Sequence, residues 1–184
     1  MPTLWEIFLY NTVLRELAQD SKAYKQKGYA ILEGKRLVRP DFLFPRGALS
    51  DGAKYPNGVL LDAKYKNLWG EVYTGKRKWK KSKEADDAAD EIRQDLFRVI
   101  AYMHLFRCET GGVVFPLRGK IQKRKSDFEL AAKGFHMSDP LLDHFLLLPF
   151  FIPQDSDHFE SDIEASAQYL RDLLIKPAAP VAPS

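Results

Sequence analysis

Two short segments of the chain carry acidic and basic residues at a spacing that suits phosphodiester chemistry. The first, Arg39-Pro-Asp-Phe42, places a carboxylate, Asp41, directly after a proline. The second, Leu61-Asp-Ala-Lys64, separates a carboxylate from a lysine by one residue. Side chains alternate across a strand, so Asp62 and Lys64 share one face if the segment is extended. Pairing of the two segments in a hairpin would then bring both carboxylates and the lysine onto one surface.

Two carboxylates beside an ammonium group favour metal-assisted hydrolysis. Asp41 and Asp62 offer the hard oxygen ligands that suit Mg²⁺, for which Mn²⁺ can substitute. A divalent cation can generate hydroxide from bound water and stabilise charge on phosphate oxygens. Lys64 can orient that water or stabilise the charge of the transition state. The alternative interpretation of the same residues is an ion-paired strand surface.

Hydrophobic periodicity predicts the elements that must position these residues. Helices are expected over 4–19, 85–107 and 161–175, and strands over 29–32, 35–44, 59–66, 113–117, 128–132 and 144–152. Thr3 and Glu6 form a capping-box pattern for the first helix. Gly111-Gly112 is expected to end the second helix, and Pro149 to interrupt or end the last strand. Residues 67–83 are expected to form a long connection.

This order of elements predicts an α/β sandwich built around a mixed central sheet. We expect a single domain over residues 1–176, because no internal repeat or second core is evident. The tail over 177–184 contains only proline, alanine, valine and serine, and is expected to be disordered.

Basic residues near the acidic motif predict contacts with nucleic acid. The residues concerned are Lys66, Lys76, Arg77, Lys78, Lys80 and Lys81, together with Arg98 and Tyr102 on the long helix. Neutralisation of phosphates by such side chains drives nucleic-acid binding. A solvated loop is the alternative for the segment from Lys76 to Lys83. On the long helix, Glu91, Asp95, Arg98 and Tyr102 form one polar stripe, and we interpret Glu91 as an exposed residue in local ion pairs.

Composition argues against several other kinds of site. The single Cys108 excludes an intramolecular disulfide and a cysteine-rich zinc site, and the four histidines lack metal-binding spacing. No GxSxG or GxGxxG motif occurs, which argues against a serine hydrolase and a dinucleotide site. The longest apolar stretch, 145–152, is far shorter than the ~20 residues of a membrane span. We therefore expect a soluble, cytoplasmic protein that does not bind membranes.

Several segments, in order, resemble the nuclease domain of the McrC subunit of McrBC-type restriction systems. They are Leu4-Trp-Glu-Ile-Phe8, Arg39-Pro-Asp-Phe-Leu-Phe44, Leu60-Leu-Asp-Ala-Lys-Tyr-Lys66, Asp95-Leu-Phe-Arg-Val-Ile-Ala-Tyr102 and Gly112-Val-Val-Phe-Pro116. The resemblance covers about residues 4–117, and its most distinctive part is the stretch from Asp62 to Lys66.

The resemblance implies a PD-(D/E)xK restriction-endonuclease-like fold and Mg²⁺-dependent cleavage of double-stranded DNA. It also implies an AAA+ GTPase partner that recognises methylated cytosine. Asp41 and Asp62 match the acids of the motif, and Lys64 matches its lysine. Glu6 matches a helix glutamate that some related nucleases use as a further metal ligand, although its capping role explains it equally well. The main-chain carbonyl of Ala63 is expected to complete the ligand set.

The chain also departs from the family pattern. Arg98 stands where related nucleases usually carry a glutamine, while Tyr102 matches their tyrosine. The family's region before the nuclease domain is missing, which suggests a truncated gene, an excised domain or a standalone relative. The segment from Gly28 to Lys35 is no P-loop, because five residues separate its glycines and Arg36 replaces the required serine or threonine. GTP hydrolysis is therefore expected on another chain.

Three functional hypotheses follow from the sequence. The leading one is the cleavage component of a modification-dependent restriction system. The second is a catalytically silent module that keeps the fold and binds or scaffolds nucleic acid. The third is a nuclease of DNA repair or of mobile-element processing.

Overall fold

The computed structural model describes residues 3–17, 24–25, 29–32, 36–46, 57–66, 68–73, 83–119, 144–154 and 157–175. Its elements are α1 (Leu4–Leu9), the π-helix η1 (Tyr10–Leu14), β1 (Tyr24–Lys25), β2 (Tyr29–Leu32), β3 (Arg36–Val38), β4 (Phe42–Phe44), β5 (Val59–Ala63), α2 (Leu68–Tyr73), α3 (Lys83–Phe106), β6 (Thr110–Arg118), β7 (His144–Ile152) and α5 (Phe159–Ile175). The strand expected over 128–132, the tail over 177–184 and the basic residues from Lys76 to Lys81 lie outside the described residues.

A five-stranded mixed sheet lies at the centre of the fold, in the order β1-β4-β5-β6-β7. β4 and β5 are antiparallel, with Phe42 opposite Leu61 and Phe44 opposite Val59, which confirms the expected hairpin pairing. β5, β6 and β7 are parallel neighbours. The carboxyl ends of these three strands therefore lie at one edge of the sheet. β2 and β3 form a separate antiparallel pair.

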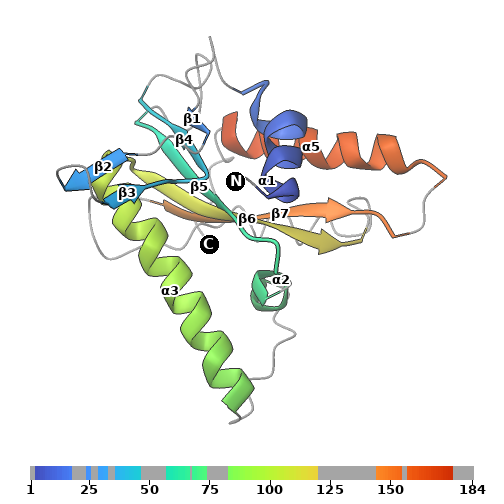
Figure 1. The fold of residues 1–184 in the computed structure, drawn as a ribbon. Coiled ribbons are helices and arrows are strands. Elements are labelled where there is room, and N and C mark those ends of the chain that lie inside the picture. Colours follow the sequence, from blue (N-terminus) through green and yellow to red (C-terminus); the bar gives the residue numbers. More distant parts are fainter. Residues whose placement is uncertain are drawn as a thin grey trace, which may run out of the picture.

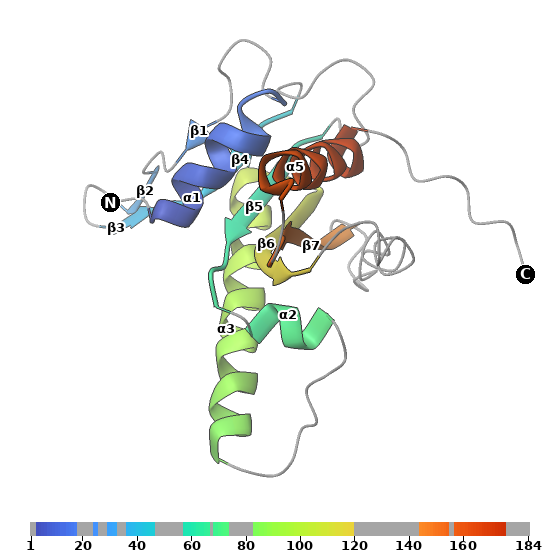
Figure 2. The same ribbon diagram turned by 90° about the vertical axis from the view of Figure 1, so that its right-hand side faces the viewer.

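Helices cover both faces of this sheet (Figure 1). α1 and α5 lie on one face and α2 and α3 on the other, and the same layering is visible after a quarter turn (Figure 2). Alternate residues of β5 serve the two layers: Leu61 packs in the core beneath α1 and α5, whereas Leu60 packs in the core beneath α2 and α3. The expectation of a mixed sheet flanked by helices is confirmed.

The first helix changes its winding halfway along. Thr3 caps it, because the Glu6 main-chain N–H donates to the Thr3 hydroxyl at 3.3 Å and that hydroxyl donates to the Glu6 carboxylate at 2.9 Å. The expected N-cap at Thr3 is thus confirmed, whereas Glu6 accepts from the Thr3 hydroxyl rather than from the main-chain N–H of a complete capping box. After Leu9 the hydrogen bonds shift to the wider π pattern, so the uniform helix expected over 4–19 is wrong in its second half.

The strand expected over 35–44 is divided in two. β3 ends at Val38 and β4 begins at Phe42, and Asp41 lies in the bend between them rather than within a strand. Pro40 explains the division, since it lacks an N–H for a ladder and restricts the residue before it. The third expected strand, 59–66, ends early at Ala63, although the Lys64 N–H still donates to the Val114 carbonyl at 2.8 Å.

Two expectations about glycine and proline were wrong. Gly111 and Gly112 lie inside β6, and α3 ends before them at Phe106, followed by Arg107 at φ 52°. A Cβ at Gly112 would overlap the main chain of Leu146, so packing requires glycine there, whereas at Gly111 it would displace the flexible side chain of Met103. Pro149 lies within β7, which continues to Ile152. This position is tolerated because β7 is the last strand of the described sheet, where a missing N–H interrupts no further ladder.

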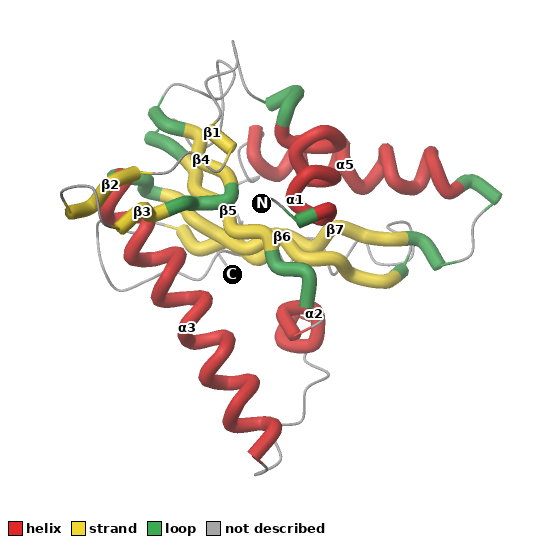
Figure 3. Tube along the Cα trace, in the orientation of Figure 1, coloured by secondary structure: helices red, strands yellow, loops and turns green. Residues whose placement is uncertain are grey.

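The connection expected over 67–83 contains a short helix. α2 spans Leu68–Tyr73 and lies on the same side of the sheet as α3 (Figure 3). Its Trp69 is buried in the core beneath α3, with Val99 and Met103 of that helix. α2 thus fills the space between the end of β5 and α3, beside the motif residues.

Candidate active site

Asp62 and Lys64 meet at the carboxyl end of β5, as their alternation predicts. Asp62 is the fourth residue of the strand and Lys64 follows its last residue. The Lys64 ammonium lies 2.5 Å from the Asp62 Oδ2 atom. Both side chains are largely buried, with exposed fractions of 16% and 8%. They project toward α2 and α3, because Leu60, two residues before Asp62, packs on that side.

Asp41 joins this pair through the main chain of β5. Its Oδ2 atom accepts a hydrogen bond from the Ala63 N–H at 2.8 Å. Burial, and next the charge of Asp62, raise the pKa of Asp41 from 3.8 to about 8, against the opposite effect of the Ala63 hydrogen bond. The structure therefore brings together Asp41, Asp62 and Lys64, the three residues that the sequence places at the centre of the site.

Glu6 approaches the same region from α1. Its side chain is buried, and its charge contributes further to the raised pKa of Asp41. Its carboxylate also accepts a hydrogen bond from the hydroxyl of Thr3, the residue that caps the helix. Glu6 therefore lies near the carboxylates with a structural role of its own, and a role as metal ligand stays a prediction.

Asp95 also belongs to the site, which the sequence did not predict. The sequence placed it only on the polar stripe of the long helix. It is 7% exposed, and its Oδ1 atom lies 2.9 Å from the Lys64 ammonium. Its Oδ2 atom accepts a hydrogen bond from the Trp69 indole at 3.2 Å. Burial lowers the pKa of Lys64, but Asp62 and Asp95 together raise it above its ordinary value. The lysine is therefore held in its charged form between two carboxylates.

A pocket of about 700 Å³ opens beside Lys64, between the end of β5, α2 and α3. Residues on its wall include Thr3, Lys66, Trp69, Glu91, Gln94 and Arg98. Within it, the Lys66 ammonium lies 2.5 Å from Glu91, so Glu91 does form an ion pair, but with a residue after β5 rather than with a local partner on its own helix. Arg98 is about half exposed and lies 3.8 Å from Asp95. Two of the expected phosphate-binding residues, Lys66 and Arg98, thus share one pocket with Lys64.

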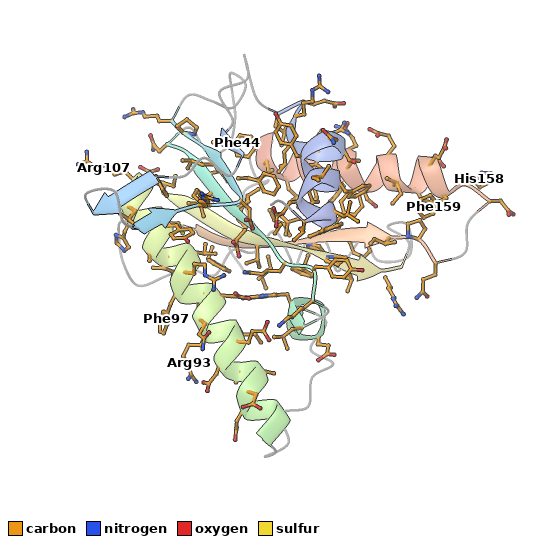
Figure 4. All side chains as sticks on the ribbon, viewed as in Figure 1. Phe44, Arg93, Phe97, Arg107, His158 and Phe159 are labelled. Carbon is orange, nitrogen blue, oxygen red and sulfur yellow. The ribbon has the colours of Figure 1, made fainter. Side chains whose placement is uncertain are left out.

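Tyr102, the remaining described residue that was expected to bind nucleic acid, is placed differently. Tyr102 is partly buried and packs edge-on against Phe106, and it is not part of the pocket wall. Arg93 and Phe97 lie on the outer side of α3, pointing away from α2 (Figure 4). The pocket therefore faces only one side of the long helix.

The carboxylate pair offers oxygen atoms that fit a cation. The Asp62 Oδ2 atom is buried and makes no hydrogen bond within the described part of the chain, apart from its ion contact with Lys64. A buried carboxylate oxygen in this state, beside the partly buried carboxylate of Asp41, is stabilised by positive charge, which Lys64 supplies and a cation could add to. Across the described ranges, however, no group of three or more acidic, histidine or cysteine side chains could hold a metal ion. Any ion at this site would therefore depend on the two aspartates and on main-chain or water oxygens.

The fold and the site together define the class of protein. It is an α/β protein that carries two carboxylates and a lysine at the end of a central strand. A family model described as the McrBC 5-methylcytosine restriction system component matches residues 1–116. The chain belongs to this family, which confirms the resemblance found in the sequence, and the match includes Glu6, Asp41, Asp62, Lys64 and Asp95. No curated protein and no solved structure matches the chain. Among the described helices, none is long and apolar enough to cross a bilayer.

Proposed function

We propose that this chain is the DNA-cleaving component of its restriction system, a Mg²⁺-dependent endodeoxyribonuclease. The observation that carries the proposal is the convergence of Asp41, Asp62 and Lys64 at one end of β5. Membership of the McrBC family supplies the biological setting, since the family's components act in restriction. Mn²⁺ would substitute for Mg²⁺, because both accept the same hard oxygen ligands.

Each residue has a distinct role in the proposed reaction. Asp41, Asp62 and the Ala63 carbonyl would hold the cation together with water, and Glu6 would act through its charge near Asp41 rather than as a third acidic ligand. When bound, such an ion lowers the pKa of water and neutralises charge on the phosphate. Lys64 would orient the attacking water or stabilise charge on the phosphorus oxygens, for which its charged form is suited.

The topology supports assignment to the PD-(D/E)xK nucleases. In that arrangement the acids and the lysine lie on a β-hairpin, and here β4 and β5 form the antiparallel pair that bears them. A parallel strand, β6, follows the long helix α3 and adds to β5. The hairpin and the parallel extension together give the mixed sheet flanked by helices that the proposal requires.

Double-stranded DNA would lie over the pocket beside Lys64. Lys66 and Arg98 line this pocket and can contact the phosphate backbone. The basic segment from Lys76 to Lys81 follows α2 in the chain and is proposed to add further phosphate contacts. An AAA+ GTPase subunit is proposed as the partner that selects methylated sites, since the chain carries no P-loop of its own.

The proposal is tested by incubating the full chain with supercoiled plasmid, cytosine-methylated or unmethylated, and with Mg²⁺ or Mn²⁺. Each reaction is run with the chain alone and with an AAA+ subunit from the same restriction system plus GTP. EDTA is the control for the cation. We expect nicking or linearisation that requires the cation, and a preference for methylated plasmid once the partner and GTP are present.

Other outcomes separate the alternatives. Cation-dependent cleavage that ignores methylation with the partner present would favour a nuclease of repair or mobile-element processing. Binding of DNA without cleavage under every condition would contradict the enzyme and favour a silent binding module.

A further inference from the structure

The Lys64 ammonium is shared between two buried carboxylates that come from different elements. Asp62, on its own strand, lies at 2.5 Å, and Asp95, on α3, lies at 2.9 Å. The first of these is a proposed cation ligand and the second is not. Lys64 and a cation would therefore compete for Asp62 but not for Asp95.

Asp95 is itself fixed by a third element. Trp69 of α2 donates its indole N–H to the second oxygen of Asp95, and Trp69 is 3% exposed. Its ring packs in the core beneath α3 and lies 6.4 Å from the ring of Phe145. Because the indole cannot move without disturbing this core, the Asp95 carboxylate is held in the orientation that faces Lys64.

Electrostatics gives this arrangement a consequence for cation binding. A divalent ion at Asp62 would repel a lysine ammonium 2.5 Å from the same carboxylate. Without another anion nearby, the Lys64 ammonium would either move into solvent or stay beside Asp62. If it stayed, it would lower the affinity of the site for the cation. Asp95 offers it a buried, preformed counter-charge at the edge of the site.

We propose that Asp95 is a positioning residue, which holds the Lys64 ammonium at the edge of the site when a divalent cation occupies Asp62. Trp69 assists by fixing the Asp95 carboxylate. The inference rests on the proposed function, because it assumes a cation at the two aspartates. It assigns to α2 and α3 the task of keeping the lysine close to the site without blocking the metal ligand.

Mn²⁺ affinity, measured by titration calorimetry on the metal-free full chain, tests this inference without relying on cleavage. The variants are Asp95→Asn, Lys64→Met and the double substitution. Asp86→Asn is the matched control, because it removes the same charge from the same helix at an exposed residue outside the pocket wall. Circular dichroism establishes that each variant is folded, and Trp69→Phe serves as a second, milder probe.

We expect Asp95→Asn to weaken Mn²⁺ binding about 10-fold, the scale at which residues that orient metal sites act. Lys64→Met should bind Mn²⁺ more tightly than the wild type, because the competing ammonium is gone. In the Lys64→Met background, Asp95→Asn should have essentially no effect. Trp69→Phe should weaken binding less than Asp95→Asn, and again only when Lys64 is present.

Loss of affinity that persists in the Lys64→Met background would overturn the inference, since Asp95 would then act by its charge or through the fold. Unchanged affinity in Asp95→Asn would overturn it as well. If the wild type binds Mn²⁺ and cleaves plasmid while Asp95→Asn binds normally, only the positioning role fails. If the wild type binds no Mn²⁺ and cleaves nothing, the proposed function and the inference fail together.

Discussion

The Asp41 carboxylate accepts a hydrogen bond from the main-chain N–H of Ala63 at 2.8 Å. This bond joins the bend before β4 to the last residue of β5, and it places the Asp41 carboxylate beside that of Asp62. Asp41 therefore carries a raised pKa of about 8, caused first by burial and then by Asp62. The two carboxylates are crowded in a way that a positive ion would relieve.

This crowding predicts how the stability of the metal-free protein depends on pH. Folded Asp41 keeps its proton up to about pH 8, whereas the unfolded chain releases it near pH 3.8. Between these values the folded state binds more protons, so the free energy of unfolding falls as pH rises and levels off above pH 8. The fall is on the order of a few kcal/mol, at about 1.4 kcal/mol per pKa unit. Asp41→Asn should remove this dependence and stabilise the protein at pH 8.

Urea unfolding at several pH values, with EDTA present, measures this effect. Asp157→Asn, at an exposed residue, is the control and should keep the wild-type profile. A wild-type slope retained in Asp41→Asn would show that another group accounts for the pH dependence.

From the Lys66–Glu91 ion pair we predict that substitutions of its two residues change DNA affinity in opposite directions. Lys66 is 71% exposed, so the pair is worth ~1 kcal/mol or less and can be exchanged for a phosphate contact. Lys66→Ala should weaken binding and lower the salt slope by about one. Glu91→Gln should strengthen binding, because it frees Lys66 and removes a negative charge from the pocket.

Fluorescence anisotropy of a labelled duplex, with Ca²⁺ in place of Mg²⁺, gives these slopes. Arg93→Ala is the matched control, since Arg93 lies on the outer side of α3 (Figure 4). An equal change in Arg93→Ala and Lys66→Ala would mean that DNA does not use this pocket.

We predict that alanine substitutions at Gly111 and Gly112 lower the free energy of unfolding to different extents. A Cβ at Gly111 would overlap the side chain of Met103, and one at Gly112 would lie 2.5 Å from the Leu146 carbonyl oxygen. Both alanine variants should lose ~1–3 kcal/mol, the usual range for overpacking. Gly112→Ala should lose more, because a main-chain atom of β7 cannot move aside as a methionine can.

Urea denaturation of the two variants, alone and with Met103→Ala, checks this order. The added cavity at residue 103 should reduce the effect of Gly111→Ala and leave that of Gly112→Ala unchanged. Equal effects of Met103→Ala on both glycine variants would contradict the packing described for β6.

From the contacts of Arg171 we predict that α5 stabilises the π-helix of the N-terminal segment. Its guanidinium is buried and donates to the Thr12 carbonyl and to Glu164, both at 2.9 Å, and it contacts Glu16 at 2.8 Å. Arg171→Met should reduce the free energy of unfolding by ~1–3 kcal/mol through the loss of these bonds. Glu164→Gln is the control, and its effect should stay below ~1 kcal/mol because Glu164 is exposed. Thermal unfolding that is equally affected in both variants would contradict the role of the Thr12 contact.

Much of the site could be predicted because it follows from local periodicity. Alternation along β5 was enough to place Asp62 and Lys64 together, and hydrophobic periodicity was enough to predict the helix that α3 forms. The pairing of the two motif segments could be inferred because both read as neighbouring strands. Such predictions need only residues that are close in the chain.

The remainder depends on packing between distant segments. Nothing local distinguishes Asp95 from the other acids on its helix, and only the position of Trp69 and Lys64 makes it a buried partner. Gly111 and Gly112 have the composition of a turn, yet the close approach of α3 and β7 places them in a strand. Pro40 did carry a local signal for the break between β3 and β4, which the apolar residues around it outweighed.

The most direct test of the central claim is the rate of plasmid cleavage by Asp62→Asn and Lys64→Ala relative to the wild type. The reactions contain Mg²⁺, methylated supercoiled plasmid, the AAA+ partner and GTP. Asp86→Asn, at an exposed residue of α3 outside the pocket wall, is the folded control. The account predicts that both variants lose at least ~100-fold in rate while they keep the fold and DNA binding, and that the control cleaves normally. Cleavage by either variant within a few-fold of the wild type would contradict the assignment of this site.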